Sequence, residues 1–235
     1  MNLNSPKFNV CMVCDFFYPR LGGVEMHIFQ LALCILYRCI IIIIFLFQGL
    51  IERGHKVIIV THAYDNRQGV RYITHGLKVY YCPIYPFVDQ ATFPNLFGFF
   101  PLFRKILIRE KIQIVHSHQA TSTLGHECVL HSRTMGLRTI YTDHSLFGFS
   151  DAACIHLNKI LKIFLSDIDH AISVSHTSRE NLCLRASLNP YNISVIPNAV
   201  VFLHKIFKLL NGFIKRIVQD SLQILLKDIL SILLI

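Results

Sequence analysis

The strongest constraint on the fold is an alternation of short apolar runs with helical stretches between residues 8 and 200. Several runs are almost continuously apolar, which is typical of strands in a parallel sheet whose two faces are covered by helices. Right-handed crossovers would then wind the chain into an α/β Rossmann-like sheet, with ligands gathered at the carboxyl ends of its strands. The expected strands are residues 8–14, 56–61, 77–82, 112–116, 138–142, 170–174 and 193–196, and the expected helices are residues 24 onward, 93–110, 122–135, 153–166 and 177–186.

The first apolar run leads into a pair of glycines and then into a helical pattern. Pro19 ends the strand, and Gly22 and Gly23 allow backbone N–H groups to approach an anion closely at the start of the helix. This layout favours a phosphate-binding loop and makes nucleotide chemistry the leading hypothesis. An ordinary strand-to-helix turn has the same sequence signature, so the glycine pair alone does not decide between the two.

Polar side chains follow several of the predicted strands. Because the carboxyl ends of parallel strands meet at one edge of a sheet, these side chains are expected to line a polar cleft. Ordinary surface and capping histidines would give the same pattern, so that interpretation also stays open. The residues concerned are Asp15, His116, His118, Asp143, His144, Ser175 and His176.

Six segments together carry a family resemblance. They are FNVCMVCDFFYPRLGGVEMHIFQLA, LIERGHKVIIVTHAY, GLKVYY, IVHSHQATSTLGHE, GLRTIYTDHSLFGF and VIPNAV. The set resembles the N-terminal half of a retaining glycosyltransferase of the GT-B type. More narrowly, it resembles the PIG-A family, the catalytic subunit of phosphatidylinositol N-acetylglucosaminyltransferase. The resemblance covers residues 8–34 and 50–200, and its specificity lies in the combination of the segments.

The resemblance implies transfer of N-acetylglucosamine from UDP-N-acetylglucosamine to phosphatidylinositol. It implies that this occurs at the cytosolic face of the endoplasmic reticulum membrane, as the first step of GPI anchor biosynthesis. Gly22 and Gly23 match the loop that faces the donor diphosphate, and His144 matches the active-site imidazole near the transferred sugar. From their positions at or near strand ends, the acceptor-side cleft is expected to include Asp15, Tyr18, His118 and Asp143.

Two stretches depart from the family pattern. Residues 35–49 interrupt the expected first helix, and deleting them joins QLALC to LIERGHKV as one amphipathic helix, which indicates an insertion. Residues 201–235 form an apolar and basic helical tail where the family continues into a donor-binding domain. We therefore expect one acceptor-side domain over residues 1–200, and we expect that this chain does not catalyse the transfer by itself. The alternative to the family function is a truncated, inactive isoform that binds membrane or the parent complex.

Composition narrows the classes of partner. The chain of 235 residues has a formal net charge of +9 and a mean hydropathy of +0.47, which suit anionic lipid and nucleotide. Its basic residues are scattered, so nucleic-acid binding is not expected. The expected partners are phosphatidylinositol, UDP-N-acetylglucosamine, other subunits of the transferase complex and a membrane surface. Residues 39–47 are too short an apolar stretch to span a membrane, whereas the tail could lie in the interface of one.

No cofactor or metal is expected. The eight cysteines are expected to be reduced and mostly buried, and Cys11 and Cys14 have no second pair at zinc-ribbon spacing. A nicotinamide-dependent dehydrogenase would need GxGxxG after the first strand, where this chain has LGGVE. A serine hydrolase would need GxSxG, which does not occur in the sequence.

Overall fold

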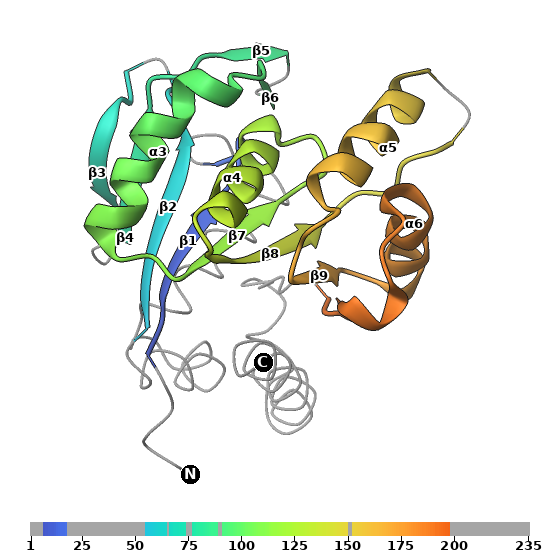
Figure 1. Ribbon diagram of the computed structural model, residues 1–235. Helices are drawn as coiled ribbons and strands as arrows, with labels where there is room; N and C mark the ends of the chain where they lie inside the picture. The colour runs from blue at the N-terminus through green and yellow to red at the C-terminus, as the bar shows by residue number, and fades with distance from the viewer. Residues whose placement is uncertain are drawn as a thin grey trace, which may run out of the picture.

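The computed structural model describes residues 7–17, 55–64, 66–73, 77–88, 91–149 and 152–197 (Figure 1). Its centre is an eight-stranded sheet in the order β10-β9-β8-β7-β1-β2-β4-β3. All neighbouring strands are parallel except β3, which runs antiparallel to β4 at one edge. The predicted α/β Rossmann-like sheet is confirmed. The strands are β1 (Asn9–Val13), β2 (Lys56–His62), β3 (Gly69–Ile73), β4 (Leu77–Cys82), β7 (Ile114–His118), β8 (Arg138–Asp143), β9 (His170–Ser173) and β10 (Ile193–Val195).

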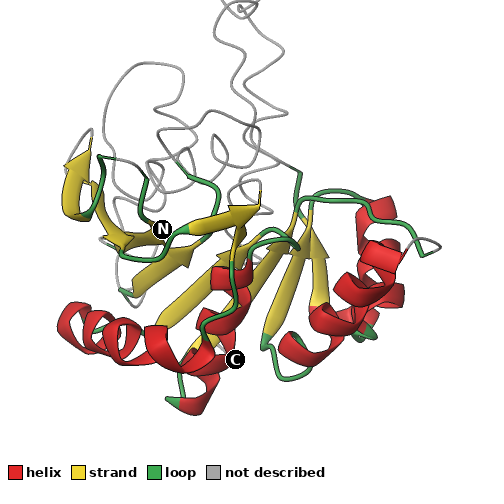
Figure 2. Ribbon diagram, turned by 90° about the horizontal axis from the view of Figure 1, so that it is seen from above, coloured by secondary structure: helices red, strands yellow, loops and turns green. Residues whose placement is uncertain are grey.

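The helices in the described ranges connect successive parallel strands. Figure 2 shows them on one side of the sheet. α3 crosses from β4 to β7, and the other three helices connect β7 to β8, β8 to β9 and β9 to β10. They confirm four of the predicted helices, with ends that differ by a few residues. They are α3 (Leu96–Glu110), α4 (Thr123–Thr134), α5 (Ala152–Phe164) and α6 (His176–Ala186), and a short 3-10 turn, η2 (Pro190–Asn192), precedes β10.

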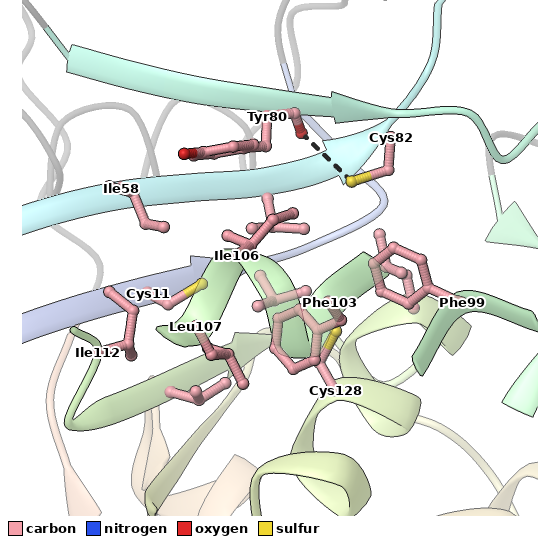
Figure 3. Packing of buried hydrophobic residues seen from close by; sticks show 14 residues of the cluster. Cys11, Ile58, Tyr80, Cys82, Phe99, Phe103, Ile106, Leu107, Ile112 and Cys128 are labelled. Carbon is pink, nitrogen blue, oxygen red and sulfur yellow. Dashed lines mark hydrogen bonds between the residues drawn. The ribbon is translucent and has the colours of Figure 1, made fainter. Parts of the chain in front are cut away.

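The main hydrophobic core lies between α3 and the centre of the sheet. In Figure 3, Phe103 and Leu107 of α3 lie against Cys11 of β1 and Ile58 of β2, and all four side chains are buried. Burying an aromatic or leucine side chain of this kind stabilises the fold by about 1.5–3 kcal/mol. Because α3 links β4 to β7, this packing fixes the place where the strand order changes direction.

The opposite face of the sheet is buried as well. Met12, Ile59 and Tyr81 form one cluster there, and Ile114 and Ile140 belong to another. No helix within the described ranges covers this face. The predicted first helix from residue 24 onward, the predicted insertion at 35–49 and the predicted tail at 201–235 lie outside the described residues.

Three strands were not predicted, and one predicted strand was displaced. β3 adds an antiparallel edge, and β5 (Pro86–Val88) pairs with β6 (Ala91–Thr92) in a separate two-stranded sheet. The strand expected at residues 112–116 is β7, which begins at Ile114 and ends at His118. The prediction that His116 and His118 follow this strand is therefore wrong, because both residues lie within it.

Six cysteines lie in the described ranges. Four of them are buried, whereas Cys154 and Cys183 are half-buried. Burial raises the pKa of the Cys82 thiol to about 12 and holds the pKa values of Cys11 and Cys128 well above their usual range. These thiols stay protonated at neutral pH and behave as small apolar side chains. Within the same ranges, no helix has both the length and the hydropathy needed to cross a membrane.

Candidate functional site

The strand order reverses at the centre of the sheet, between β1 and β7. From β1 the chain proceeds outward through β2 and β4, and α3 then carries it back to β7 on the other side of β1. In open α/β sheets, ligands bind in the crevice outside the carboxyl ends of the strands at such a switch point. The residues that follow β1, β7 and β8 are therefore the first place to look for a site.

Asp15 follows β1 and joins three elements at the switch point. Its carboxylate accepts hydrogen bonds from the Thr92 hydroxyl at 3.1 Å and from the Leu124 N–H at 3.2 Å. Its backbone N–H donates to the hydroxyl of Ser122, the N-cap of α4, at 3.0 Å. The side chain is fully buried, so a carboxylate here acts as the counter-charge to the N-terminus of α4.

Replacing Asp15 by asparagine is expected to remove a pH dependence of stability. Burial raises the pKa of Asp15 to about 7, although hydrogen bonds from Leu124, Thr92 and Ser122 oppose the rise. Because the pKa of Asp15 is higher in the folded protein than its usual value, the protonated side chain stabilises the fold. This contribution to the free energy of unfolding is complete below about pH 4 and is lost as the pH rises through 7. Asparagine preserves the shape, so from pH 5 to pH 8 the wild type should lose on the order of 2 kcal/mol relative to Asp15→Asn in urea unfolding. Parallel pH curves for the two proteins would contradict this assignment.

Three imidazoles form a row across the ends of β7 and β8. The rings of His116 and His118 lie with their centroids 4.1 Å apart, and those of His118 and His144 stack at 5.5 Å. His116 Nε2 lies 2.7 Å from the Thr142 hydroxyl oxygen, which fixes the inner end of the row. His116 and His118 are two positions apart in β7, so their side chains share one side of the strand.

His144 is the outermost ring of the row. It is half-buried, and its Nε2 lies 3.2 Å from Nδ1 of His118, within hydrogen-bonding distance. One of these nitrogens must donate and the other accept, so the tautomer of His144 is tied to that of His118. Such a pair can present an oriented donor or acceptor to a hydroxyl group. His176 is exposed at the first turn of α6, and no contact within the described ranges joins it to the row.

Gln119 ties the end of β7 to the segment that carries His144. Its φ is 74°, in the left-handed region that a non-glycine residue seldom occupies. Its N–H donates to the Thr142 carbonyl at 3.0 Å, and its side-chain carbonyl accepts from the Ser145 hydroxyl at 3.0 Å. Strained backbone of this kind is concentrated at functional sites, and nothing in the sequence pattern pointed to it.

Asp143 faces inward from the end of β8. Its carboxylate forms an ion pair with Arg185 of α6, and both side chains are fully buried. It also accepts a hydrogen bond from the Tyr141 hydroxyl at 3.2 Å. Burial raises the pKa of Asp143, and the charge of Arg185 opposes the rise. The assignments of Asp15, His118 and Asp143 to an acceptor-side cleft stay predictions, while Tyr18, Gly22 and Gly23 lie outside the described residues.

Known proteins resemble most of this sequence. A family model described as PIGA (GPI anchor biosynthesis) matches residues 62–151. The chain is 54% identical over 195 residues to a phosphatidylinositol N-acetylglucosaminyltransferase subunit of Arabidopsis thaliana, covering 83% of this chain and 40% of the relative. Over the matched part, the chain is similar to proteins of the PIG-A family. The human relative of the same name is 54% identical over 192 residues, covering 82% of this chain and 37% of the relative. The chain thus spans about 40% of the length of these curated PIG-A relatives.

Solved structures support the same sheet architecture for this chain. The Staphylococcus aureus MnaA–UDP co-structure matches with a TM-score of 0.55 at 13% identity, covering 81% of this chain and 45% of that one. A sucrose-phosphate synthase from Thermosynechococcus elongatus matches with a TM-score of 0.53 at 14% identity, covering 92% and 96%. At such low identity these matches show the fold alone. Among the described residues, no group of three His, Cys, Asp or Glu side chains could hold a metal ion.

Gly125 allows α4 to approach β7 closely. A Cβ at this position would lie 2.3 Å from the Ser117 hydroxyl oxygen and 2.9 Å from that of Ser122. Gly125→Ala is therefore expected to destabilise the fold by about 1–3 kcal/mol in chemical unfolding. Ser117→Ala removes the nearer obstacle, so the double variant should recover part of the loss. Strict additivity of the two substitutions would show that the clash is not the cause.

Proposed function

We propose that this chain supplies the acceptor-side domain for transfer of N-acetylglucosamine from UDP-N-acetylglucosamine to phosphatidylinositol, the first step of GPI anchor biosynthesis. The observation that carries the proposal is the identity of 54% to relatives named for this transferase, over a stretch that includes the switch point. The proposed setting is the cytosolic face of the endoplasmic reticulum membrane. The proposed partners are the other subunits of the transferase complex and the membrane surface.

His144 is the proposed active-site imidazole. A retaining transfer requires the diphosphate leaving group to be stabilised on the same side of the sugar as the incoming hydroxyl, so polar groups must converge there. An imidazole whose tautomer is set by a hydrogen bond at 3.2 Å to His118 can orient a hydroxyl of the sugar or of the inositol ring. The stacked row limits the rotation of the His144 ring, which favours this positioning role.

The donor diphosphate is proposed to lie at Gly22 and Gly23, as in the family pattern. Among the described residues, the N-terminus of α4 lies near the switch point, and its Leu124 N–H already donates to the buried carboxylate of Asp15. A phosphate there would have to displace a carboxylate from its own counter-charge. The α4 terminus therefore serves the fold, and the glycine pair remains the proposed diphosphate site.

Binding of a short-chain phosphatidylinositol tests the proposal. The full chain should bind it, with shifts of the His118 and His144 ring signals in nuclear magnetic resonance spectra, whereas short-chain phosphatidylcholine should leave these signals unchanged. Equal shifts with both lipids, or with neither, would contradict an acceptor site at this edge of the sheet.

A transfer assay separates the two forms of the proposal. Microsomes that lack the endogenous catalytic subunit would be supplemented with this chain, and transfer of labelled N-acetylglucosamine to phosphatidylinositol would be measured. Product would establish the full activity. Binding of the short-chain lipid and of the complex without product would assign the chain to a non-catalytic isoform that retains the acceptor side.

A further inference from the structure

We infer that Arg185 is a positioning residue that holds the segment Asp143–Phe147, and with it His144, in the geometry required for transfer. The inference rests on the proposed function, because only there does His144 acquire a role in the reaction. Arg185 lies on α6 and is separated by 42 positions from Asp143. It acts on the site only through the segment that it holds.

Arg185 contacts the segment on both sides of His144. Its guanidinium pairs with the carboxylate of Asp143, which precedes His144, and lies 3.4 Å from the carbonyl oxygen of Ser145, which follows it. The guanidinium carbon also lies 5.2 Å from the centre of the Phe147 ring, within the range of a cation–π contact. A single planar group therefore fixes the backbone both before and after the imidazole.

A second side chain of α6 supports the same segment. The amide of Asn181 donates to the Phe147 carbonyl oxygen at 3.0 Å. Asn181 and Arg185 are four positions apart and so lie on one face of the helix. Inside the segment, the N–H of Ser145 lies 3.4 Å from the carboxylate of Asp143, which adds a local link next to His144. α6 thus holds the segment through Asn181 and Arg185, and Gln119 holds it through Ser145.

Stability alone does not explain a buried ion pair at this position. Two charges lose their hydration on burial, and replacing such a pair by apolar side chains is often neutral or stabilising. Within the described ranges, Nε and Nη1 of Arg185 have no hydrogen-bond partner although the side chain is fully buried. Unmade hydrogen bonds of this kind cost additional free energy. The burial of the Arg185 guanidinium is better explained by the geometry that its rigid, planar group imposes on the segment.

Two variants test the inference in the full chain. Asp143→Asn with Arg185→Met removes both charges together, so no unpaired charge stays buried. Asn181→Ala removes the second support and leaves the ion pair in place. Arg179→Met is the matched control, because Arg179 lies on the same helix and donates to the Pro190 carbonyl at an exposed position. All three variants are expected to keep the unfolding free energy within about 1 kcal/mol of the wild type.

The deciding readouts are the His144 imidazole in Asn181→Ala and the kcat of the double variant, because Asp143 adjoins His144 and its replacement shifts the ring signals by itself. In Asn181→Ala, the His144 ring signals and titration midpoint should move, while Arg179→Met leaves both unchanged. At the matching positions of a full-length relative, the kcat of the double variant should fall about 10- to 100-fold with KM altered less than about threefold. Unchanged His144 signals in Asn181→Ala together with an unchanged kcat of the double variant would overturn the inference. Normal transfer by a relative that lacks the imidazole would instead overturn the proposed function and leave the positioning result intact.

Discussion

In a full-length relative, replacing the histidine that matches His144 by alanine is expected to lower the rate of N-acetylglucosamine transfer about 100-fold or more. The imidazole ends a stacked row, and its hydrogen bond to His118 at 3.2 Å ties its tautomer to that of His118, which supports the proposed role of positioning a hydroxyl. Its loss removes an oriented polar group and leaves the sheet beneath intact. The measurement is transfer of labelled N-acetylglucosamine to phosphatidylinositol in microsomes.

His176→Ala is the matched control for this substitution. His176 also follows a strand of the sheet, but it is exposed at the start of α6 and lies outside the row. Transfer by this variant should stay near the wild-type rate. Near-normal turnover by the His144 variant would remove the imidazole from the mechanism, whatever its effect on stability.

Replacing Glu110 by alanine is expected to give the largest loss of stability, about 3 kcal/mol in urea unfolding at pH 7. Glu110 is the last residue of α3, and its carboxylate accepts hydrogen bonds from Lys78 and Tyr80 and forms an ion pair with Lys56. Its side chain is only 4% exposed, and that of Lys78 is 16% exposed. Removing the carboxylate leaves the Lys78 ammonium and the Tyr80 hydroxyl with little access to water.

The pH dependence identifies the charge of Glu110 as the cause. Burial alone would raise its pKa, but hydrogen bonds from Lys56, Lys78 and Tyr80 outweigh burial and lower the pKa to about 2. For a carboxyl group with a lowered folded pKa, the stabilisation is present above about pH 4.5 and is lost as the pH falls through 2. The stability difference between the wild type and Glu110→Gln should therefore shrink over this interval. Glu180→Gln, at an exposed position of α6, should show no such trend. A constant difference for Glu110→Gln would contradict the assignment.

The parallel strands could be predicted because they are apolar on both faces. β2 and β4 are buried almost throughout, so their sequences read as continuous apolar runs. β3 could not be recognised in this way, since Val70 and Tyr72 are both largely exposed and Arg71 lies between them. Its pairing at the sheet edge depends on β4 and not on a pattern of its own. β5 and β6 have too few residues to show any period.

The candidate site could be predicted only in part. His118 and His144 were expected at one edge because parallel strands end together, and their rings do stack. Arg185 could not be anticipated, because it lies in a polar helical sequence, HTSRENLCLRA, where an arginine is expected to be solvated. Its burial follows from the position of α6 against the end of β8, which is tertiary information. The left-handed backbone of Gln119 has no signature in the sequence either.

The central position of β1 has a consequence for how the chain folds. Val10 of β1 pairs with Ile114 of β7, so this contact joins segments about a hundred residues apart. The pairs β7–β8, β8–β9 and β9–β10 join segments that are much closer together along the chain. Closing short loops loses less entropy and is faster, so the β7–β10 half can assemble before β7 pairs with β1. During synthesis on the ribosome, β1 can pair with β2 first, but the edge of β1 that faces β7 stays unpaired until β7 has emerged and is accessible to chaperones for that interval.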